Sequence, residues 1–536
     1  MWSRSWASLW LFLSFLALGW ASLSDGVPEA LQYACLEGRC QSLSRSQLLT
    51  GEKGVSQARC EATCSGRLWP LPKSSSVGEE QVAVDPSAIS IHTLKLEPGW
   101  LEAEATPLLE VFRLRWSQLL QPPTLGLSLR VSVQVSKGLG LSARLLDSKM
   151  EESYELDLRL AEDEQGLLGV IKAASLFGAR HGLESLGQLF FLDDGQLLLP
   201  ASASIRDAPA FPYRGLSLDL ARHFYPIPSI ERVIDGMAMN KLNALHLHLS
   251  DSQSFPLQVP AWLNLSFFGA YGPSQIYSPA DIRHLHLYAI HRGVHIVPEI
   301  DAPSHVGAGW DWLEEAGLGE ALLGYSGVNG AAGKELIVEY WGDSASDGLP
   351  QLISSGHEVI VANYDAWYLD CGAGWWVGEG VNWCSPFKDW RSVYNNRPYE
   401  GLHGNWSLDE AARGRILGGE ACVWSETIGP GNLEVRLWPR GAALAERLWS
   451  DPPDCWLAAE ARFEVQARRM AQAGFQVEPL GPEWCEQGRG QCTVPESQWE
   501  ERDIDSTCNR RHEQRTVWTY PMSPSAASTS ASDVFI

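Results

Sequence analysis

The strongest constraint in this sequence is an alternation of buried strands and helices that begins near Pro209. Runs that are apolar almost throughout predict six strands, at 213–221, 244–251, 293–301, 334–341, 357–365 and 415–424. Amphipathic helices are expected between them. Strands that are apolar on both faces are typical of parallel sheets covered by helices. The second half of the chain therefore predicts an α/β fold built on a parallel sheet.

One of the intervening helices has clear boundary residues. Ser278 can cap its first turn, Pro279 suits the first helical position, and Gly293 follows its last turn. A helix between these residues, followed at once by the third strand, is the connection that a parallel sheet requires.

Acidic or aromatic residues gather where the predicted strands end, at Asp251, Asp301, Trp341, Asp365 and Trp424. In a (β/α)8 barrel the carboxyl ends of the strands form the face that carries the chemistry. We therefore expect a (β/α)8 TIM barrel with its functional residues on this face.

The barrel is too short by its strand count. A barrel of about 250 residues gives each strand–helix unit roughly 31 residues. The distance along the chain from Gly293 to Lys334 leaves room for one such unit, and the Gly-rich stretch 311–333 contains a short helix at best. Six strands are predicted instead of eight.

A smaller α+β domain is expected before the barrel. Residues 127–135 and 153–160 alternate as half-buried strands, and 173–190 have helical spacing. The predicted organisation is an N-terminal targeting segment, a cysteine-containing segment, the α+β domain, the barrel and a cysteine-containing tail that is disordered from about 521. The corresponding ranges are 1–24, 25–80, 81–206, 207–480 and 481–536.

The first residues favour entry into the secretory pathway. Arg4 precedes an uncharged, mostly apolar run that ends near Leu23, and small residues such as Ala21 and Ser22 follow the apolar core. This pattern is typical of a cleaved signal peptide; an uncleaved signal anchor is the alternative. The sequons at Asn264 and Asn405 predict N-glycosylation. An extracellular or lysosomal protein is expected.

The 11 cysteines agree with that compartment. Zinc is the rival explanation, but the spacings lack the ordered partners of a zinc site, so disulfides are favoured. The odd count leaves one thiol over. The candidates for disulfides are Cys35, Cys40, Cys60, Cys64, Cys371, Cys384, Cys485 and Cys492.

Composition limits the partners. The net charge of −24 argues against nucleic acid, because neutralising phosphates requires a basic surface. The 24 tryptophans are far above ordinary usage. Taken singly each is more simply a core residue, yet flat apolar faces are also what sugar rings stack on.

The residues at the strand ends resemble a known family. The runs RGLSLDLARHFYP, HLHLSDSQSFP, VPEIDAPSHVGAGWDW, NYDAWYLDCG and LGGEACVWSE are similar to glycoside hydrolase family 20, the β-N-acetylhexosaminidases. The likeness is to the arthropod enzymes that degrade chitooligosaccharides or trim N-glycans. It extends from about residue 30 to 495, and it implies the barrel and the preceding α+β domain.

The resemblance implies a reaction that needs no cofactor. Such enzymes remove a terminal non-reducing N-acetylglucosamine or N-acetylgalactosamine with retention, and the 2-acetamido oxygen of the sugar is the nucleophile. An Asp orients the acetamido group while the adjacent Glu acts as general acid. A glycan or oligosaccharide containing N-acetylglucosamine is the implied partner, and a homodimer is possible.

By the same resemblance, Asp251, Asp301 and His305 form the polar network that supports the acid. Tyr368 holds the acetamido oxygen in line for attack. Arg214, Asp370 and Glu426 are expected to form hydrogen bonds with sugar hydroxyls. Trp341 and Trp424 are expected to pack against the acetamide group, and Trp383 and Trp376 to stack on a second sugar.

Two histidines on the second strand invite a metal interpretation. His246 and His248 share one face of that strand. Packing inside the barrel explains them better, so no metal is predicted.

The family's Gly-Gly-Asp-Glu motif, which carries the acid, is missing from the sequence. The adjacent Asp-Glu pairs are Asp163–Glu164 and Asp409–Glu410, and neither follows a buried strand. The family likeness continues to about Leu322 and resumes near Lys334. A coding block removed between them would take strands 4 and 5, the acid and one pocket tryptophan, and it could also take cysteines and leave the odd count.

This chain is therefore predicted to have negligible turnover. Two other hypotheses remain. A non-catalytic glycan binder would keep the pocket without the chemistry. A chitinase-type glycosidase is weaker, because it needs a strand ending in spaced acids of the D-x-x-D-x-D-x-E kind, which the sequence lacks.

Overall fold

A computed structural model describes residues 32–481 of the chain. Its longer gaps are 94–100, 120–125, 137–150, 311–335, 375–382 and 400–409, with shorter ones at 37, 44–46, 49–52, 65, 163–164, 303 and 373. The predicted signal segment 1–24 and the tail beyond 481 lie outside the described residues, as do Trp376, Asn405, Cys485 and Cys492.

The cysteine-containing segment is a small disulfide-linked unit. It comprises β1 (Tyr33–Leu36), β2 (Arg39–Ser42) and α3 (Gln57–Thr63). The bonds Cys35–Cys64 and Cys40–Cys60 join the hairpin to the helix region. These disulfides and Cys371–Cys384 confirm the predicted use of six cysteines.

Among the described cysteines, one has a free thiol. It is Cys422, which lies buried on strand β16 (Ile416–Val423). Cys455, which the sequence did not single out, is also disulfide-bonded.

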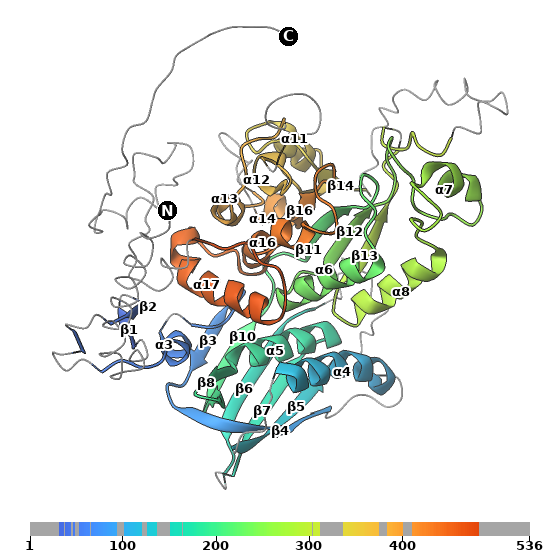
Figure 1. The fold of residues 1–536 in the computed structure, drawn as a ribbon. Coiled ribbons are helices and arrows are strands. Elements are labelled where there is room, and N and C mark those ends of the chain that lie inside the picture. Colours follow the sequence, from blue (N-terminus) through green and yellow to red (C-terminus); the bar gives the residue numbers. More distant parts are fainter. Residues whose placement is uncertain are drawn as a thin grey trace, which may run out of the picture.

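The α+β unit contains an eight-stranded sheet in the order β3-β10-β6-β7-β5-β4-β9-β8 (Figure 1). Its strands are β3 (Ser74–Val77), β4 (Gln81–Thr93), β5 (Leu127–Val135), β6 (Tyr154–Leu160), β7 (Gly166–Ala173), β8 (Phe191–Asp193), β9 (Gln196–Pro200) and β10 (Ala203–Asp207). β5 and β6 confirm the two predicted strands. β3 adds a strand before residue 81, where the sequence placed the start of this domain.

Helix α5 (Leu176–Leu189) joins this sheet to the rest of the molecule. The Ser175 hydroxyl caps it by accepting from the Gly178 N–H, and 13 of its 14 residues are buried. Helix α4 (Leu101–Leu119) packs beside it against the sheet. Figure 1 places α5 between the sheet and α6 (Ile227–Met239), and the Arg180 guanidinium donates to the Ala238 carbonyl of α6 at 2.6 Å.

The second half of the chain contains a six-stranded sheet in the order β13-β12-β11-β16-β15-β14. All neighbouring strands in it are parallel. The six strands confirm the six predicted runs: β11 (Tyr213–Asp219), β12 (Ala244–His248), β13 (His295–Glu299), β14 (Ile337–Tyr340), β15 (Glu358–Val361) and β16.

This sheet is six strands of a TIM barrel. The chain order places β11, β12 and β13 as the first three strands and β14, β15 and β16 as the last three, and β11 pairs with β16 where the barrel closes. Among the described residues no strand pairs with the outer edge of β13 or of β14. Residues 311–335 lie between these strands in sequence and outside the description.

Helices cover the outside of the barrel sheet. They include α8 (Pro279–Ile290), α11 (Gly348–Ser354), α13 (Trp390–Asn395), α16 (Arg440–Ser450) and α17 (Trp456–Gln472). α8 has the predicted boundaries: Ser278 and Asp281 form a capping box, Pro279 is the first residue, and Gly293 adopts φ +74°. Among the described residues, no helix is long and apolar enough to cross a membrane.

Arg214 is not at the functional face, so its predicted contact with sugar hydroxyls is wrong. It lies at the amino end of β11, fully buried against the α+β unit. Its guanidinium donates to both carboxylate oxygens of Glu152, at 2.7 and 3.0 Å, and to the carbonyl of Lys241. The arginine thus uses its planar fork on a carboxylate of the neighbouring unit.

A second buried ion pair lies beside the first. Lys241 Nζ contacts Asp207 at 2.9 Å and also donates to the Tyr154 hydroxyl. The indole N–H of Trp449 donates to the same Asp207 carboxylate, and its ring stacks under Arg214. The contact between the two units is therefore polar at its centre and closely paired.

Replacing Arg214 with alanine should destabilise the protein by about 3–5 kcal/mol, because it leaves the Glu152 carboxylate buried without its guanidinium. Urea denaturation measures this change. The matched control is Arg206→Ala, which removes a largely exposed arginine 3.8 Å from Glu155 and should cost at most about 1 kcal/mol. Equal midpoints for the two variants would contradict this account of the contact.

Candidate active site

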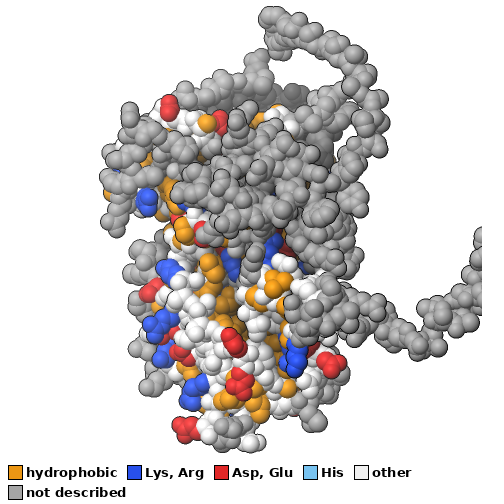
Figure 2. Space-filling view, turned by 90° about the vertical axis from the view of Figure 1, so that its left-hand side faces the viewer, with side chains coloured by type: hydrophobic (Ala, Val, Ile, Leu, Met, Phe, Trp, Pro, Cys, Tyr) orange, Lys and Arg blue, Asp and Glu red, His pale blue; other side chains and the backbone are white. Residues whose placement is uncertain are grey.

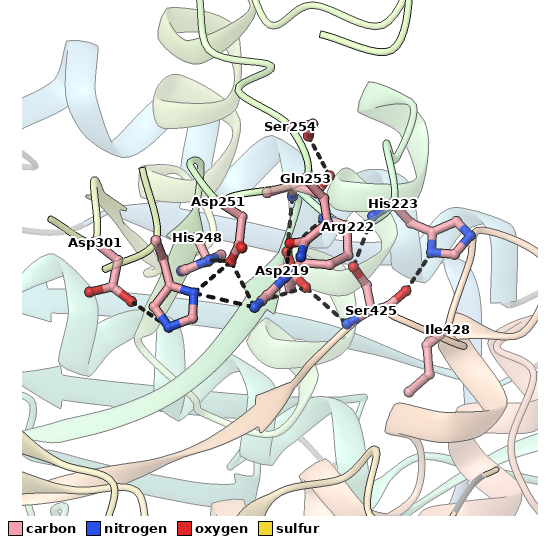
Figure 3. A network of polar contacts seen from close by, with 12 residues as sticks. Asp219, Arg222, His223, His248, Asp251, Gln253, Ser254, Asp301, Ser425 and Ile428 are labelled. Carbon is pink, nitrogen blue, oxygen red and sulfur yellow. Dashed lines mark hydrogen bonds and ion pairs between the residues drawn. The ribbon is translucent and has the colours of Figure 1, made fainter. Parts of the chain in front are cut away.

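A polar network lies at the carboxyl ends of β11, β12, β13 and β16 (Figure 3). Asp219, the last residue of β11, is fully buried and accepts hydrogen bonds from the backbone N–H groups of Ala221, Arg222 and Ser425. It therefore joins the loops that follow the first and the last strand of the barrel.

Arg222 links Asp219 to Asp251. Its guanidinium lies 3.1 Å from the Asp219 carboxylate and 2.7 Å from the Asp251 carboxylate, and it stacks 5.5 Å from the Trp424 ring. It is the arginine that the sequence analysis missed. The signal was present, because Arg222 follows the carboxyl end of the strand in LDLARHFYP whereas Arg214 stands at the amino end.

The Asp251 carboxylate also contacts two histidines. Its Oδ2 lies 2.9 Å from His248 Nε2 and 3.1 Å from His305 Nδ1. Burial alone would raise its pKa, but the hydrogen bond with His248 and the charge of Arg222 outweigh it and lower the pKa. Asp301 lies 3.9 Å from His305 Nε2. The structure thus brings together Asp251, Asp301 and His305 as the sequence predicts.

The pair of histidines on β12 belongs to a polar barrel interior. His248 Nδ1 lies 2.6 Å from Glu299, and although burial opposes its charge, the hydrogen bonds with Asp251 and Glu299 raise its pKa to about 9. His246 Nδ1 lies 2.9 Å from the buried Glu420 of β16, and its Nε2 lies 3.3 Å from Glu299.

Each of these histidines belongs to a set of residues with atoms close enough to share a metal: His246 with Glu339 and Glu420, and His248 with Glu299 and Asp301. In the structure, both nitrogens of each imidazole already face carboxylates. Hydrogen bonds between charged groups therefore account for these histidines as part of the barrel interior.

Aromatic side chains lie beside the polar network. Trp424 is in edge contact with Trp341 at 5.6 Å, with Tyr368 at 5.7 Å and with His248 at 5.2 Å between ring centroids. Trp341 donates its indole N–H to Glu339 at 2.5 Å. The two predicted acetamide-pocket tryptophans and Tyr368 therefore form one cluster at the ends of β14, β15 and β16.

Trp383 extends this cluster into solvent. Its ring lies 6.2 Å from that of Tyr368 and 5.1 Å from that of Tyr364, yet 73% of Trp383 is exposed. The disulfide Cys371–Cys384 closes the loop that carries it. An exposed indole held beside buried aromatics is available to a flat ligand.

Asp370 and Glu426 are among the carboxyl groups at this end whose pKa values are raised. Burial, with the nearby charge of Glu426 adding to it, raises the pKa of Asp370 to about 7. Burial also raises the pKa of Glu426, whereas the charge of Arg222 lowers it. These groups lie together near the aromatic cluster, where each could exchange hydrogen bonds with a polar ligand.

Comparison with known proteins identifies the chain. The sequence model of a protein family, described as glycosyl hydrolase family 20, catalytic domain, matches residues 211–325 and 320–452 of this chain. A chitooligosaccharidolytic β-N-acetylglucosaminidase of Bombyx mori is 31% identical over 620 residues, covering 90% of this chain and 100% of the relative. The chain belongs to glycosyl hydrolase family 20. A probable β-hexosaminidase, fdl, of Drosophila melanogaster is 30% identical and covers 87% of this chain and 91% of its own.

Solved structures agree with this family 20 fold. The N-acetyl-β-hexosaminidase of Streptomyces plicatus has a TM-score of 0.58 at 22% identity, with 78% of this chain and 97% of that chain covered. The Vibrio harveyi exo-β-N-acetylglucosaminidase in complex with N-acetylglucosamine has a TM-score of 0.59 at 20% identity, with 77% and 78% covered.

The family model matches this chain in two blocks. They overlap at residues 320–325, which lie between β13 and β14 in the sequence. The alignment with the Bombyx mori relative spans 620 positions, more than the 536 residues of this chain, so the relative carries positions without a counterpart here.

The raised pKa of Asp370 predicts a pH-dependent contribution to stability. Its carboxyl titrates near 7 when folded, against about 3.9 when unfolded, so the folded state holds an extra proton between these values. The stabilisation is complete below about pH 4 and is lost as the pH rises through 7, at up to about 1.4 kcal/mol per pH unit.

The variant Asp370→Asn should lose that pH dependence when the free energy of unfolding is measured by urea titration from pH 4 to 8. Asp389→Asn is the matched control, because it removes a half-exposed carboxylate that caps α13 outside the site. A wild-type profile that Asp370→Asn leaves unchanged would show that burial does not hold the proton on this carboxyl.

Proposed function

We propose that this chain derives from an exo-acting β-N-acetylhexosaminidase, keeps the elements that recognise a terminal N-acetylglucosamine, and has negligible turnover. The observation that carries the proposal is the meeting of Trp341, Tyr368 and Trp424 with the Arg222–Asp251 ion pair at the carboxyl end of one barrel sheet. The names of the relatives, which are β-N-acetylglucosaminidases and hexosaminidases, support this substrate class.

Each retained group has a part in recognition under this proposal. Trp341 and Trp424 wall the acetamido group, and the Tyr368 hydroxyl donates to the acetamido oxygen. Arg222 takes the place first given to Arg214 and donates to sugar hydroxyls with a planar fork. At the same end of the barrel, Asp370 and Glu426 form hydrogen bonds with sugar hydroxyls. A second sugar stacks on Trp383.

The chemistry fails at proton transfer. Substrate-assisted hydrolysis needs a general acid for the leaving oxygen and a carboxylate that orients the acetamido group. The sequence has no Gly-Gly-Asp-Glu, and neither of its two Asp-Glu pairs, at 163–164 and 409–410, directly follows one of the six barrel strands along the chain. Asp251, Asp301 and His305 would then support an acid that is absent.

Purified chain should hydrolyse a chromogenic N-acetylglucosaminide at least about a thousandfold more slowly than the Bombyx mori relative assayed beside it, because general acid catalysis alone contributes 10²–10⁴-fold. A rate equal to the relative's would contradict the proposal. Reading the transcript between the codons for Leu322 and Lys334 tests its origin, since a longer transcript form should encode Gly-Gly-Asp-Glu there.

A glycan-binding role is the second candidate, because the aromatic cluster and the ion pair survive without the acid. If the site binds, N-acetylglucosamine oligomers should raise the melting temperature of the wild-type chain. Arg222→Ala and Trp424→Ala should abolish this shift. Leu192→Ala, which removes an exposed leucine of β8 in the α+β unit, should leave it unchanged.

The outcome separates the two roles. A cooperative transition that oligomers do not shift would eliminate glycan binding, and a chain without a cooperative transition would show that the six-stranded barrel cannot support either role. A shift that persists in both site variants would place binding elsewhere on the molecule.

Passage through the secretory pathway is part of the same proposal. Disulfides such as Cys35–Cys64 and Cys371–Cys384 persist in oxidising compartments, which supports an extracellular or lysosomal location. On the face shown in Figure 2, acidic and basic side chains are interspersed over the described part, which presents no basic patch suited to nucleic acid there. Homodimerisation remains a prediction.

A further inference from the structure

A short helix at the edge of the barrel presents apolar side chains to solvent. Helix α7 (Leu263–Gly269) follows β12, and it carries most of a group that we call the α7 patch. Phe267 is 76% exposed, and the other members are between 42% and 55% exposed. The patch consists of Trp262, Leu263, Phe267, Phe268 and Tyr271.

The patch is held in place by the opposite face of the helix. Leu265, Ser266 and Gly269 are buried. At Gly269 a Cβ atom would lie 2.8 Å from Phe255 and 3.0 Å from Gly309, so the helix approaches its neighbours closely. The exposed aromatic rings therefore belong to a packed element. A rigid apolar patch on a surface indicates that something covers it.

Asn264 lies within this patch and is exposed. Residues three and four positions apart share one face of a helix, so Asn264 neighbours both Phe267 and Phe268. Side chains in a helix tilt toward its N-terminus, which inclines the two rings toward Asn264. Asn264-Leu265-Ser266 is also a sequon for N-glycosylation.

We propose that an N-linked oligosaccharide on Asn264 covers the α7 patch, with its first sugars packed on the aromatic rings. The amide Nδ2 of Asn264 loses a proton and forms a bond to C1 of the first N-acetylglucosamine. The bond between C1 and the pyrophosphate oxygen of a lipid-linked oligosaccharide donor breaks, and the lipid pyrophosphate leaves with the electron pair.

The covalent attachment favours this occupant over a separate partner. A tethered sugar reaches neighbouring rings at a high effective concentration without a second molecule. Sugar rings have apolar faces that pack on aromatic side chains, and their hydroxyls remain in water, so a glycan makes this surface polar. The inference rests on entry into the secretory pathway and is independent of the sugar site at the barrel end.

The test uses the full chain secreted from eukaryotic cells. Peptide mapping before and after enzymatic removal of N-glycans should show that Asn264 is occupied. Asn264→Gln should then increase the fluorescence of the apolar dye ANS by roughly twofold or more, because the patch becomes accessible. Adding Phe267→Ser and Trp262→Ser to Asn264→Gln should return the fluorescence to the wild-type value, and both side chains are exposed enough to be replaced without opening the core.

Asn405→Gln is the matched control, because it removes the other predicted sequon and changes no residue of α7. It should leave dye binding unchanged. An unmodified Asn264 would overturn the proposal, whether or not Asn405 carries a glycan. So would an occupied Asn264 whose loss leaves dye binding at the wild-type level. None of these readouts depends on hydrolysis or on oligomer binding, so they stand apart from the proposed function.

Discussion

The pairing of β11 with β12 on one side and β16 on the other holds this site together. β11 is buried along its whole length and forms parallel ladders with both neighbours. Because the strands are in register at their carboxyl ends, the loops that follow them converge. Asp219 ties two of these loops through the Ser425 N–H, and Arg222 carries the connection on to Asp251.

This arrangement explains how a barrel with six described strands keeps so much of its functional face. The seam between β11 and β16 is paired, and the strands that have no outer partner among the described residues, β13 and β14, lie on the other side. The polar contacts of Asp219 and Arg222 lie beside the seam. Under the proposed function, the acid of the family would have followed a strand between β13 and β14, away from these contacts.

The sequence predicted the barrel sheet well because buried parallel strands have an unmistakable pattern. Every predicted run contains an observed strand, and the Ser278 cap begins a real helix. Strand β3 was missed for the opposite reason: Ser74–Val77 is short, polar and exposed throughout, so no alternation marks it. Its place in the sheet comes from pairing with β10, far along the chain.

The sequence predicted individual residues of the site better than it predicted the contacts between them. Asp251 and Trp424 were found because each follows a strand end, and His305 and Tyr368 were found through the family resemblance. The prediction for Arg214 was wrong because this residue stands at the amino end of β11, opposite the functional face. The contact between His246 and Glu420 joins strands separated by most of the barrel sequence, so no local pattern could reveal it.

Near Trp383, a disulfide bond restricts an exposed side chain that burial does not restrict. The bond between Cys371 and Cys384 closes a loop with a sequence separation of 13, and Trp383 stands next to the second cysteine. An exposed indole would ordinarily lose much conformational freedom on meeting a ligand. Here the crosslink has already restricted it. Reduction of that bond would release the restraint on Trp383. If a sugar stacks on this indole as proposed, the redox state of the surroundings would also set its affinity.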